Sequence, residues 1–381
     1  MFRALLLAGA ALGVIVSPAV AAPAKKSSNA ATLAASNPFA KPSTLPFQAP
    51  DFSKIKDSDY LPALLAGMAG QKREVAAIAN NPAPPTFNNT MVALERSGAL
   101  LEWANLAFSA VNGANTNDTL QDVETKTAPL FAAHNDYIYL NPKLFARVKT
   151  LHDNQASLSL NPEQARLLKV QYDQFVKAGA QLSPEKQAQL KQLNKQLSSL
   201  QTEFSQRLLA AAKAGALHVT DKAALAGLSE DQIAAAAQAA KDRGVEGYVL
   251  PLQNTTQQPS LESLTDRATR EALYKASITR VSKGDANDTR NLISEIAQLR
   301  AKKAGLLGFS NYAAYALQDQ MAKTPEAALA FINRIQPSLT AKEKAEYADI
   351  QKLVDAQGGG FKAPGGKKRK KGGPWGLIKT R

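Results

Sequence analysis

The feature that most constrains the fold is one long stretch, residues 182–213, in which apolar side chains recur at helical spacing. Intervals of three and four residues place these side chains along one face of an α-helix. Ser183 is a typical N-cap residue, Pro184 suits the first helical position, and Glu185 suits the first turn. The sequence therefore predicts a long amphipathic helix that begins at Pro184. Its apolar stripe consists of Leu190, Leu193, Leu197, Leu200, Phe204 and Leu208.

A second helix is predicted just upstream of this one. Residues 161–164 (NPEQ) form a capping-box pattern that opens it. Leu168, Tyr172 and Phe175 would share its apolar face. Because only a short connection separates the two helices, we expect them to pack as a long antiparallel pair.

The rest of the chain is also predicted to be mostly helical. Ala and Leu dominate and aromatic residues make up only 6%, which favours helix-on-helix packing over sheets. The segment 247–253 (GYVLPLQ) is the best strand candidate, and Pro251 restricts it to a sheet edge. The expected fold class is mostly α, with at most a small β element near residues 247–253. Further helices are expected from Asp57 or Ser58, from Met91, from the capping box at residues 229–232 (SEDQ) to Gly244, over residues 264–278, 291–307 and 311–321, and after Thr324, with a kink at Pro337.

The first residues have the composition of a secretory signal peptide. Arg3 provides a positive start, residues 4–16 form a short apolar run, and residues 19–21 (AVA) form a cleavage site with small residues. The apolar run is too short to span a membrane, and no later run approaches that length. We therefore expect a signal peptide over residues 1–21, export to the periplasm with cleavage near Ala21, and no membrane association afterwards. A Pro/Ser-rich lead-in would follow over residues 22–50.

Positive charge is concentrated at the end of the chain. The net charge is +14, and eight of the 46 lysines and arginines lie in residues 357–381, which contain no acidic residue. The remaining chain carries little excess charge, which argues against a specific nucleic-acid face. The run at residues 367–371 (KKRKK) could bind a polyanion, or it could belong to an unstructured tail with incidental charge. The second interpretation is favoured, and residues 358–381 are expected to form a disordered or out-of-frame tail.

The sequence offers no catalytic constellation. Its three histidines, His134, His152 and His218, are 18 and 66 residues apart, whereas a helical zinc site needs two His four residues apart. No G-x-S-x-G pattern is present, and the lack of cysteine excludes a thiol nucleophile. A lone histidine beside Asn135 and Asp136, as His134 is, more often occupies a surface or satisfied core position. We therefore predict no catalytic and no metal-binding residues, and the substrate-binding residues stay unknown.

Three stretches resemble a known family. They are residues 37–68 (NPFAKPSTLPFQAPDFSKIKDSDYLPALLAGM), residues 129–153 (PLFAAHNDYIYLNPKLFARVKTLHD) and residues 299–332 (LRAKKAGLLGFSNYAAYALQDQMAKTPEAALAFI). They are similar to the N-terminal half of the M3 family of zinc metallopeptidases, most closely the bacterial peptidyl-dipeptidases. The resemblance implies that residues 51–357 form the helical N-terminal region of such a peptidase.

The resemblance also implies a fold and an activity. In this family two helical halves enclose a deep channel that admits oligopeptides, from which dipeptides are released at the C-terminus. Zinc is held in the second half, on a helix that carries H-E-x-x-H. This chain contains no H-E-x-x-H. None of the family's catalytic residues or zinc ligands can therefore be placed on it, and no zinc is expected to bind.

Three functional interpretations remain open. In the first, the chain is an inactive, truncated form of a peptidyl-dipeptidase, translated out of frame from about Ala363, where the composition changes abruptly. In the second, it is a non-enzymatic fragment that binds peptides or a polyanion. In the third, it is a fragment without function. An apolar surface that would normally face the other half could also drive self-association.

Overall fold

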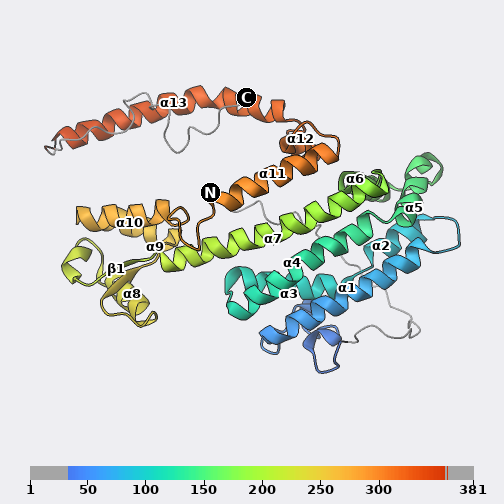
Figure 1. Ribbon diagram of the computed structural model, residues 1–381, viewed down its shortest axis with the longest axis horizontal. Helices are drawn as coiled ribbons and strands as arrows, with labels where there is room; N and C mark the ends of the chain where they lie inside the picture. The colour runs from blue at the N-terminus through green and yellow to red at the C-terminus, as the bar shows by residue number, and fades with distance from the viewer. Residues whose placement is uncertain (1–32, 357, 359–381) are drawn as a thin grey trace.

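The computed structural model describes residues 33–356 and residue 358. The signal peptide predicted over residues 1–21 lies outside these residues, as does the predicted tail except for Gly358, so both stay predictions. The described chain is mostly α-helical, as the sequence predicts, with one small two-stranded sheet. Long helices lie side by side across the body, and the last of them, α13, lies along one side (Figure 1).

The elements follow the chain in the order shown in Figure 1. The first helices are α1 (Asp57–Ala79), α2 (Ala93–Glu95), α3 (Ala99–Ala114), α4 (Asp118–Tyr139), α5 (Pro142–Asp153), α6 (Pro162–Ala178) and α7 (Pro184–Ala214). They are followed by β1 (Leu217–Val219), α8 (Glu230–Lys241), β2 (Tyr248–Leu250), α9 (Asn254–Ser263), α10 (Arg267–Thr279), α11 (Arg290–Leu306), α12 (Tyr312–Leu317) and α13 (Pro325–Ala356). Short 3-10 helices lie at Pro38–Ala40, Pro46–Gln48, Gln155–Ser157 and Lys222–Leu225, and a π-helix at Phe87–Val92.

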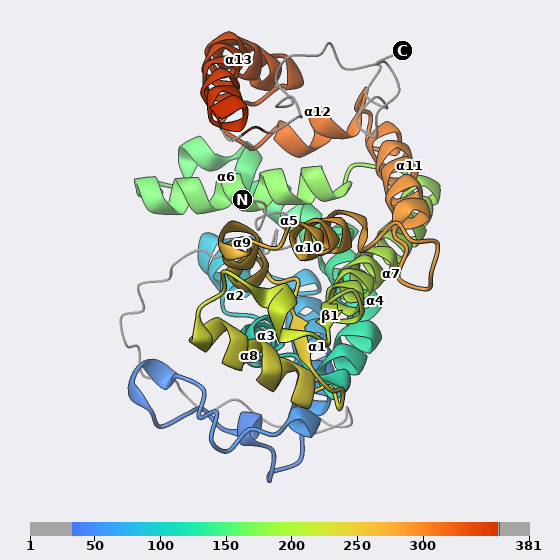
Figure 2. The same cartoon turned by 90° about the vertical axis from the view of Figure 1, so that its left-hand side faces the viewer.

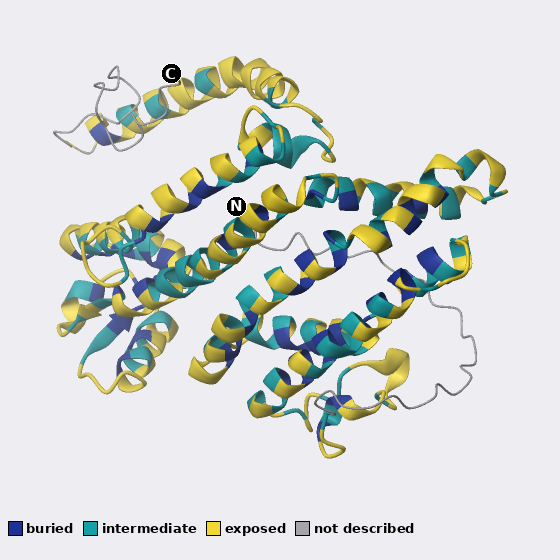
Figure 3. Ribbon diagram, turned by 45° about the vertical axis from the view of Figure 1, so that its right-hand side comes forward, coloured by how far each residue is buried: buried dark blue, intermediate teal, exposed yellow. Residues whose placement is uncertain are grey.

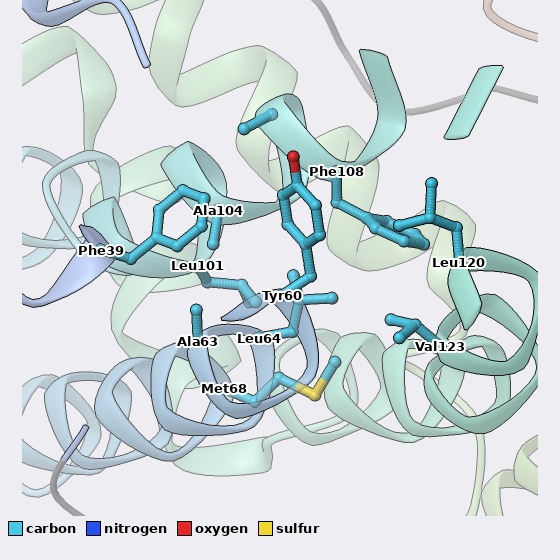
Figure 4. Packing of buried hydrophobic residues seen from close by; sticks show 11 residues of the cluster. Phe39, Tyr60, Ala63, Leu64, Met68, Leu101, Ala104, Phe108, Leu120 and Val123 are labelled. Carbon is cyan, nitrogen blue, oxygen red and sulfur yellow. The ribbon is translucent and has the colours of Figure 1, made fainter. Parts of the chain in front are cut away.

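The first core lies between α1, α3 and α4. Figure 4 shows Tyr60 of α1 directed toward α3, where its ring centroid lies 5.5 Å from that of Phe108. Phe39, from the segment before α1, closes this core against Trp103, with ring centroids 5.1 Å apart. These contacts bury aromatic rings from three parts of the chain, so the approach to α1 is part of the fold.

Two helix boundaries differ from the prediction. The helix expected from Met91 is interrupted by a turn at Gly98, whose φ of 81° lies in the left-handed region that favours glycine. The Gly98 N–H donates a hydrogen bond to the Glu74 carboxylate at 2.7 Å, which holds this turn against α1. The N-cap of α1 is Lys56, one residue earlier than predicted, because the Asp59 carboxylate accepts a hydrogen bond from the Lys56 N–H.

The predicted helix caps are otherwise present. The Asn161 side chain accepts from the Gln164 N–H and the Gln164 side chain accepts from the Asn161 N–H, which is the expected capping box. Ser183 caps α7, Ser229 caps α8, and Thr324 caps α13 through their side-chain oxygens. Each cap satisfies a backbone donor only three residues away, so it depends on local sequence alone.

The predicted antiparallel pair of α6 and α7 is wrong. Helix α7 packs along α4 and α11, whereas α6 packs against α5 and α4. The buried face of α6 is already used, because Leu168 and Phe175 belong to a second core with α5 and the end of α1. Along α7, Leu197 lies against Ile296 and Leu299 of α11. The apolar stripe of α7 therefore packs against two helices, α4 and α11, that are distant in sequence.

The predicted strand is confirmed as β2, which pairs antiparallel with β1 so that His218 lies opposite Val249. Neither β1 nor α9 is among the predicted elements, and neither are the longer helices α4 and α5. β1 and α9 are short, and β1 has only three residues. The two strands pack with α8, α9 and α10 around Leu225, Leu264 and Leu273, which are fully buried. This makes a small third core at one end of the molecule.

The last helices are mainly as predicted. The helices expected over residues 264–278 and 291–307 correspond to α10 and α11, whereas α12 ends four residues before the predicted limit at Met321. Helix α13 runs through Pro337, packs mainly against α12, and otherwise stands away from the body (Figures 1 and 2). Most of its residues are exposed (Figure 3). None of the helices in the described part of the chain is long and apolar enough to cross a membrane.

Candidate functional site

The three histidines lie on different elements, and each is engaged. His134 is on α4, His152 on α5 and His218 on β1. The His152 ring stacks on that of Tyr172 with centroids 3.7 Å apart, and His218 Nε2 lies 2.6 Å from the Glu246 carbonyl oxygen. No three His, Cys, Asp or Glu side chains in the described chain are grouped so that they could hold a metal ion. The three histidines therefore do not fit a zinc site, and no step of a zinc-dependent reaction can be assigned to them.

His134 is a buried core residue. A core position is one of the two positions, surface or core, that the sequence favours for a lone histidine. His134 is 2% exposed, and its Nε2 lies 2.7 Å from the Gln71 side-chain oxygen, so Nε2 is the donor. The Gln71 amide in turn donates to the Ser97 carbonyl at 3.3 Å, which links α4 and α1 to the turn before α3. Burial and the positive charge of Lys72 lower the pKa of His134 from 6.5 to about 4. The lowered pKa favours the neutral form of the His134 ring at pH 7.

Because the His134 pKa is lowered by folding, acid should destabilise the protein through this residue. The unfolded chain binds a proton near pH 6.5 and the folded chain only near pH 4, so stability is full above pH 6.5 and falls as the pH drops from 6.5 to 4. Each pKa unit corresponds to about 1.4 kcal/mol, so we expect a loss of roughly 2–3 kcal/mol from this group. Urea unfolding of the wild type and His134→Gln at pH 7 and pH 4.5 would measure it. An equal acid loss in both proteins would contradict the prediction.

A chain of polar contacts joins α4, α7 and α11. Asp136 accepts a hydrogen bond from the Asn194 side-chain amide at 2.7 Å, and the Asn194 side-chain oxygen accepts one from the Lys303 ammonium at 2.7 Å. Burial raises the pKa of Asp136, while the Asn194 hydrogen bond opposes this shift. Burial also lowers the pKa of Lys303. A single amide therefore bridges a carboxylate and an ammonium group across three helices.

This polar cluster continues to α12. The Tyr315 ring centroid lies 5.7 Å from the Lys303 ammonium and 5.6 Å from the Lys177 ammonium of α6. Lys177 also pairs with Asp319 at 2.6 Å. Burial, and then the nearby Tyr312 and Asp319, raise the pKa of Tyr315 to about 12, so its hydroxyl stays protonated. The cluster fixes α12 to the body and contains no activated nucleophile.

This cluster could not be predicted from the sequence. Asp136 and Asn194 are 58 residues apart, and Asn194 and Lys303 are 109 residues apart. No motif or periodicity relates such positions. The one local sign was Asp136, which lies two residues from His134 and was noted for that reason alone.

Two shallow grooves on the described part of the chain could receive a ligand. One, of about 510 Å³, lies between α7 and α11, and the other, of about 320 Å³, lies where α4 joins α5. Both combine amide or ammonium groups with apolar side chains, and neither contains a pair of carboxylates or a hydroxyl beside a histidine. The second groove also contains the Asp136 carboxylate, together with the ammonium groups of Lys143 and Lys191. The first is lined by Gln189, Gln192, Leu193, Lys302 and Leu306.

Comparison with known proteins decides the family. The sequence profile of "Peptidase family M3" matches residues 260–368. A dipeptidyl carboxypeptidase of Escherichia coli (strain K12) is 48% identical over 328 residues, which cover 86% of this chain and 48% of the relative. A dipeptidyl carboxypeptidase of Salmonella typhimurium is 48% identical over 326 residues, covering 85% of this chain and 48% of the relative. The chain belongs to peptidase family M3.

Similarity extends to other peptidases of this family. Oligopeptidase A of Escherichia coli (strain K12) is 28% identical over 322 residues, or 84% of this chain and 47% of the relative. The M3 chain thus spans about half the length of the curated relatives it matches. The M3 profile covers α10 to α13 and ends at residue 368, inside the predicted tail. The helical fold and the family predicted from the sequence are confirmed.

Proposed function

We propose that this chain is the non-catalytic helical part of a zinc-dependent peptidyl-dipeptidase, which releases dipeptides from the C-termini of oligopeptides. The single observation that carries the proposal is the 48% identity to two dipeptidyl carboxypeptidases over most of the chain. Such identity over 86% of the chain supports a shared surface for peptides. Under this proposal the chain helps to form the wall of a peptide channel, and residues outside it hold the metal and activate water.

The proposed cellular setting follows from the sequence. The leader over residues 1–21 supports export to the periplasm, and the Pro/Ser-rich lead-in over residues 22–50, which contributes Phe39 to the first core, would precede the helical region, residues 51–357. In that compartment the substrates would be short peptides, with no role for nucleic acid. Residues 358–381 are proposed to lie outside the folded region.

The first expected result is that the purified chain alone does not hydrolyse peptides. It should release no dipeptide from an oligopeptide with a free C-terminus, with or without added Zn²⁺, because its sequence has no H-E-x-x-H. Product is measured by chromatography, with the Escherichia coli dipeptidyl carboxypeptidase as the active control. Chelator-sensitive hydrolysis that follows the amount of this chain would overturn the proposal.

A second candidate function is peptide binding without catalysis. The groove between α7 and α11 supports it, because Leu193 and Leu306 provide apolar contact while Gln189 and Gln192 provide amide groups for a peptide backbone. A fluorophore on the peptide extends the same experiment to this candidate, because neither candidate expects product and this one requires binding by the isolated chain. Saturable binding without product, at high salt as well as low salt, would favour a binding fragment.

A further inference from the structure

Residues 217–280, which we call the arm, enclose a hydrophobic core of their own. Figure 1 shows α8, α9, α10 and β1 of the arm together at one end of α7. Every buried hydrophobic residue of the third core, and each partly buried one packed against it, lies within residues 217–276. In the described chain the main contacts of α8, α9 and α10 are with one another, with the two strands and with the 3-10 helix Lys222–Leu225. The arm is therefore packed largely against itself.

The arm is inserted at one end of a pair of antiparallel helices, α7 and α11. The Asn194 side chain of α7 accepts a hydrogen bond from Lys303 of α11 at 2.7 Å. Further along α7, Arg207 donates one to the carbonyl oxygen of Asp288, just before α11 begins. Residue numbers thus rise along α7 while they fall along α11, so the two helices form a hairpin. The arm, with short segments on both sides, is the connection of this hairpin.

The chain enters and leaves the arm at nearly the same place. Gly215 is the C-cap of α7, and a Cβ placed on it would lie 3.7 Å from the Cβ of Arg280, which follows α10. From there residues 281–289, the return segment, lead to α11. This segment is closed on itself, because the Thr289 N–H donates to the Val281 carbonyl oxygen at 3.0 Å. Both junctions therefore lie side by side at the end of the hairpin.

A polar contact holds the return segment to α7. The Arg207 guanidinium donates to the Asp288 carbonyl oxygen at 2.9 Å and also pairs with Glu203 at 2.5 Å. The Asp288 carboxylate accepts from the Gly284 N–H at 2.8 Å and pairs with Arg290, so Asp288 is fixed within the segment. Two compact units that are not joined by a large apolar interface are expected to move relative to each other.

We propose that the arm is a separate cooperative unit that pivots on the α7–α11 hairpin, with Gly215 and the return segment as hinges. A core that is complete within one stretch of chain can open without opening its neighbours, as the cooperative units of native proteins do. The contact from Arg207 to the Asp288 carbonyl oxygen would limit the motion, because it ties one hinge to α7. The inference does not rest on the proposed peptidase function.

The separate opening of the arm is tested by hydrogen exchange on the full 381-residue chain. Leu273→Ala removes a fully buried side chain from the core of the arm. It should speed exchange of the slow amides of α8 and β2 about a hundredfold and leave those of α7 and α11 unchanged. Leu197→Ala, in the core of the hairpin, is the matched control and should have the opposite pattern. Faster exchange of both regions in either variant would mean one cooperative unit and overturn the proposal.

The pivot is tested by pulsed EPR distances between pairs of spin labels, since the chain contains no cysteine to interfere with labelling. Labels at the exposed positions Lys241 of α8 and Lys195 of α7 span the junction, whereas Glu102 of α3 and Lys195 lie within the body. The first pair should give the broader distance distribution. Arg207→Met should broaden the first distribution alone, and Arg166→Met, on α6, should change neither. Equal widths for both pairs, in the wild type and in Arg207→Met, would show a fixed arm and overturn the pivot.

Discussion

Gly67→Ala is expected to destabilise the protein by about 3 kcal/mol, because a methyl group has no room there. An added Cβ would lie 2.7 Å from the Leu101 Cα and 2.8 Å from the Leu101 backbone nitrogen. Both atoms belong to the backbone of α3, so no side-chain rotation can relieve the contact. The helices α1 and α3 would have to separate in the middle of the first core. Urea unfolding followed by circular dichroism measures the change.

The matched control is Gly70→Ala, one turn further along α1. The nearest atom to an added Cβ there is the flexible end of Arg73, at 3.9 Å. Alanine is the better helix former, so this variant should gain about 0.5–1 kcal/mol. The two identical substitutions are thus expected to act with opposite signs. Similar effects in both variants would mean that α1 and α3 are not in the contact described above.

Arg147→Met should cost about 3 kcal/mol, because it removes the donors that hold residues 81–90 against α5. Arg147 is 7% exposed, and its guanidinium donates to the carbonyl oxygens of Asn81 and Ala83 at 2.9 and 3.0 Å. It also donates to the Asn89 side-chain oxygen at 2.8 Å. Methionine keeps much of the side-chain volume but removes the donor of these partly buried hydrogen bonds. The free energy of unfolding is again measured in urea.

Arg166→Met is the control for this prediction. Arg166 is exposed on α6, so the same substitution should change stability by less than about 0.5 kcal/mol. Arg147→Lys should fall between the two, because an ammonium group can reach only some of the same acceptors. Equal stability of Arg147→Met and the wild type would show that the loop is held by its apolar contacts alone.

The parts of the fold that sequence could predict are those fixed by neighbouring residues. The start of α7 depends on Ser183 and a backbone N–H three residues later, so its prediction needed no knowledge of the tertiary structure. The fold class and the strand at β2 followed in the same way from composition, periodicity and Pro251.

Pairing between helices could not be predicted in this way. The stripe of α7 shows that the helix has an apolar face, but any apolar face of suitable length could cover it. The structure selects α4 and α11 because α6 is already occupied by the second core. The break at Gly98 has a similar cause, since the Glu74 carboxylate that stabilises the turn lies 24 residues away.

The contacts of the candidate site are even harder to predict from local sequence than the pairing of helices. The bridge from Asp136 through Asn194 to Lys303 joins helices that only the fold brings together. Each of the three residues is an ordinary helix-surface type when read alone. The family resemblance could suggest an activity for the whole peptidase, but it could not place these contacts.

A chimeric enzyme tests most directly whether this chain is the helical part of a peptidyl-dipeptidase. In it, the segment of Escherichia coli dipeptidyl carboxypeptidase that aligns with this chain, at 48% identity over 328 residues, is replaced by the residues of this chain. The measurement is zinc-dependent release of dipeptides from an oligopeptide, with zinc content and helicity determined on the same sample. We expect the chimera to fold, bind zinc and release dipeptides. A folded, zinc-loaded chimera without hydrolysis would contradict the proposed function.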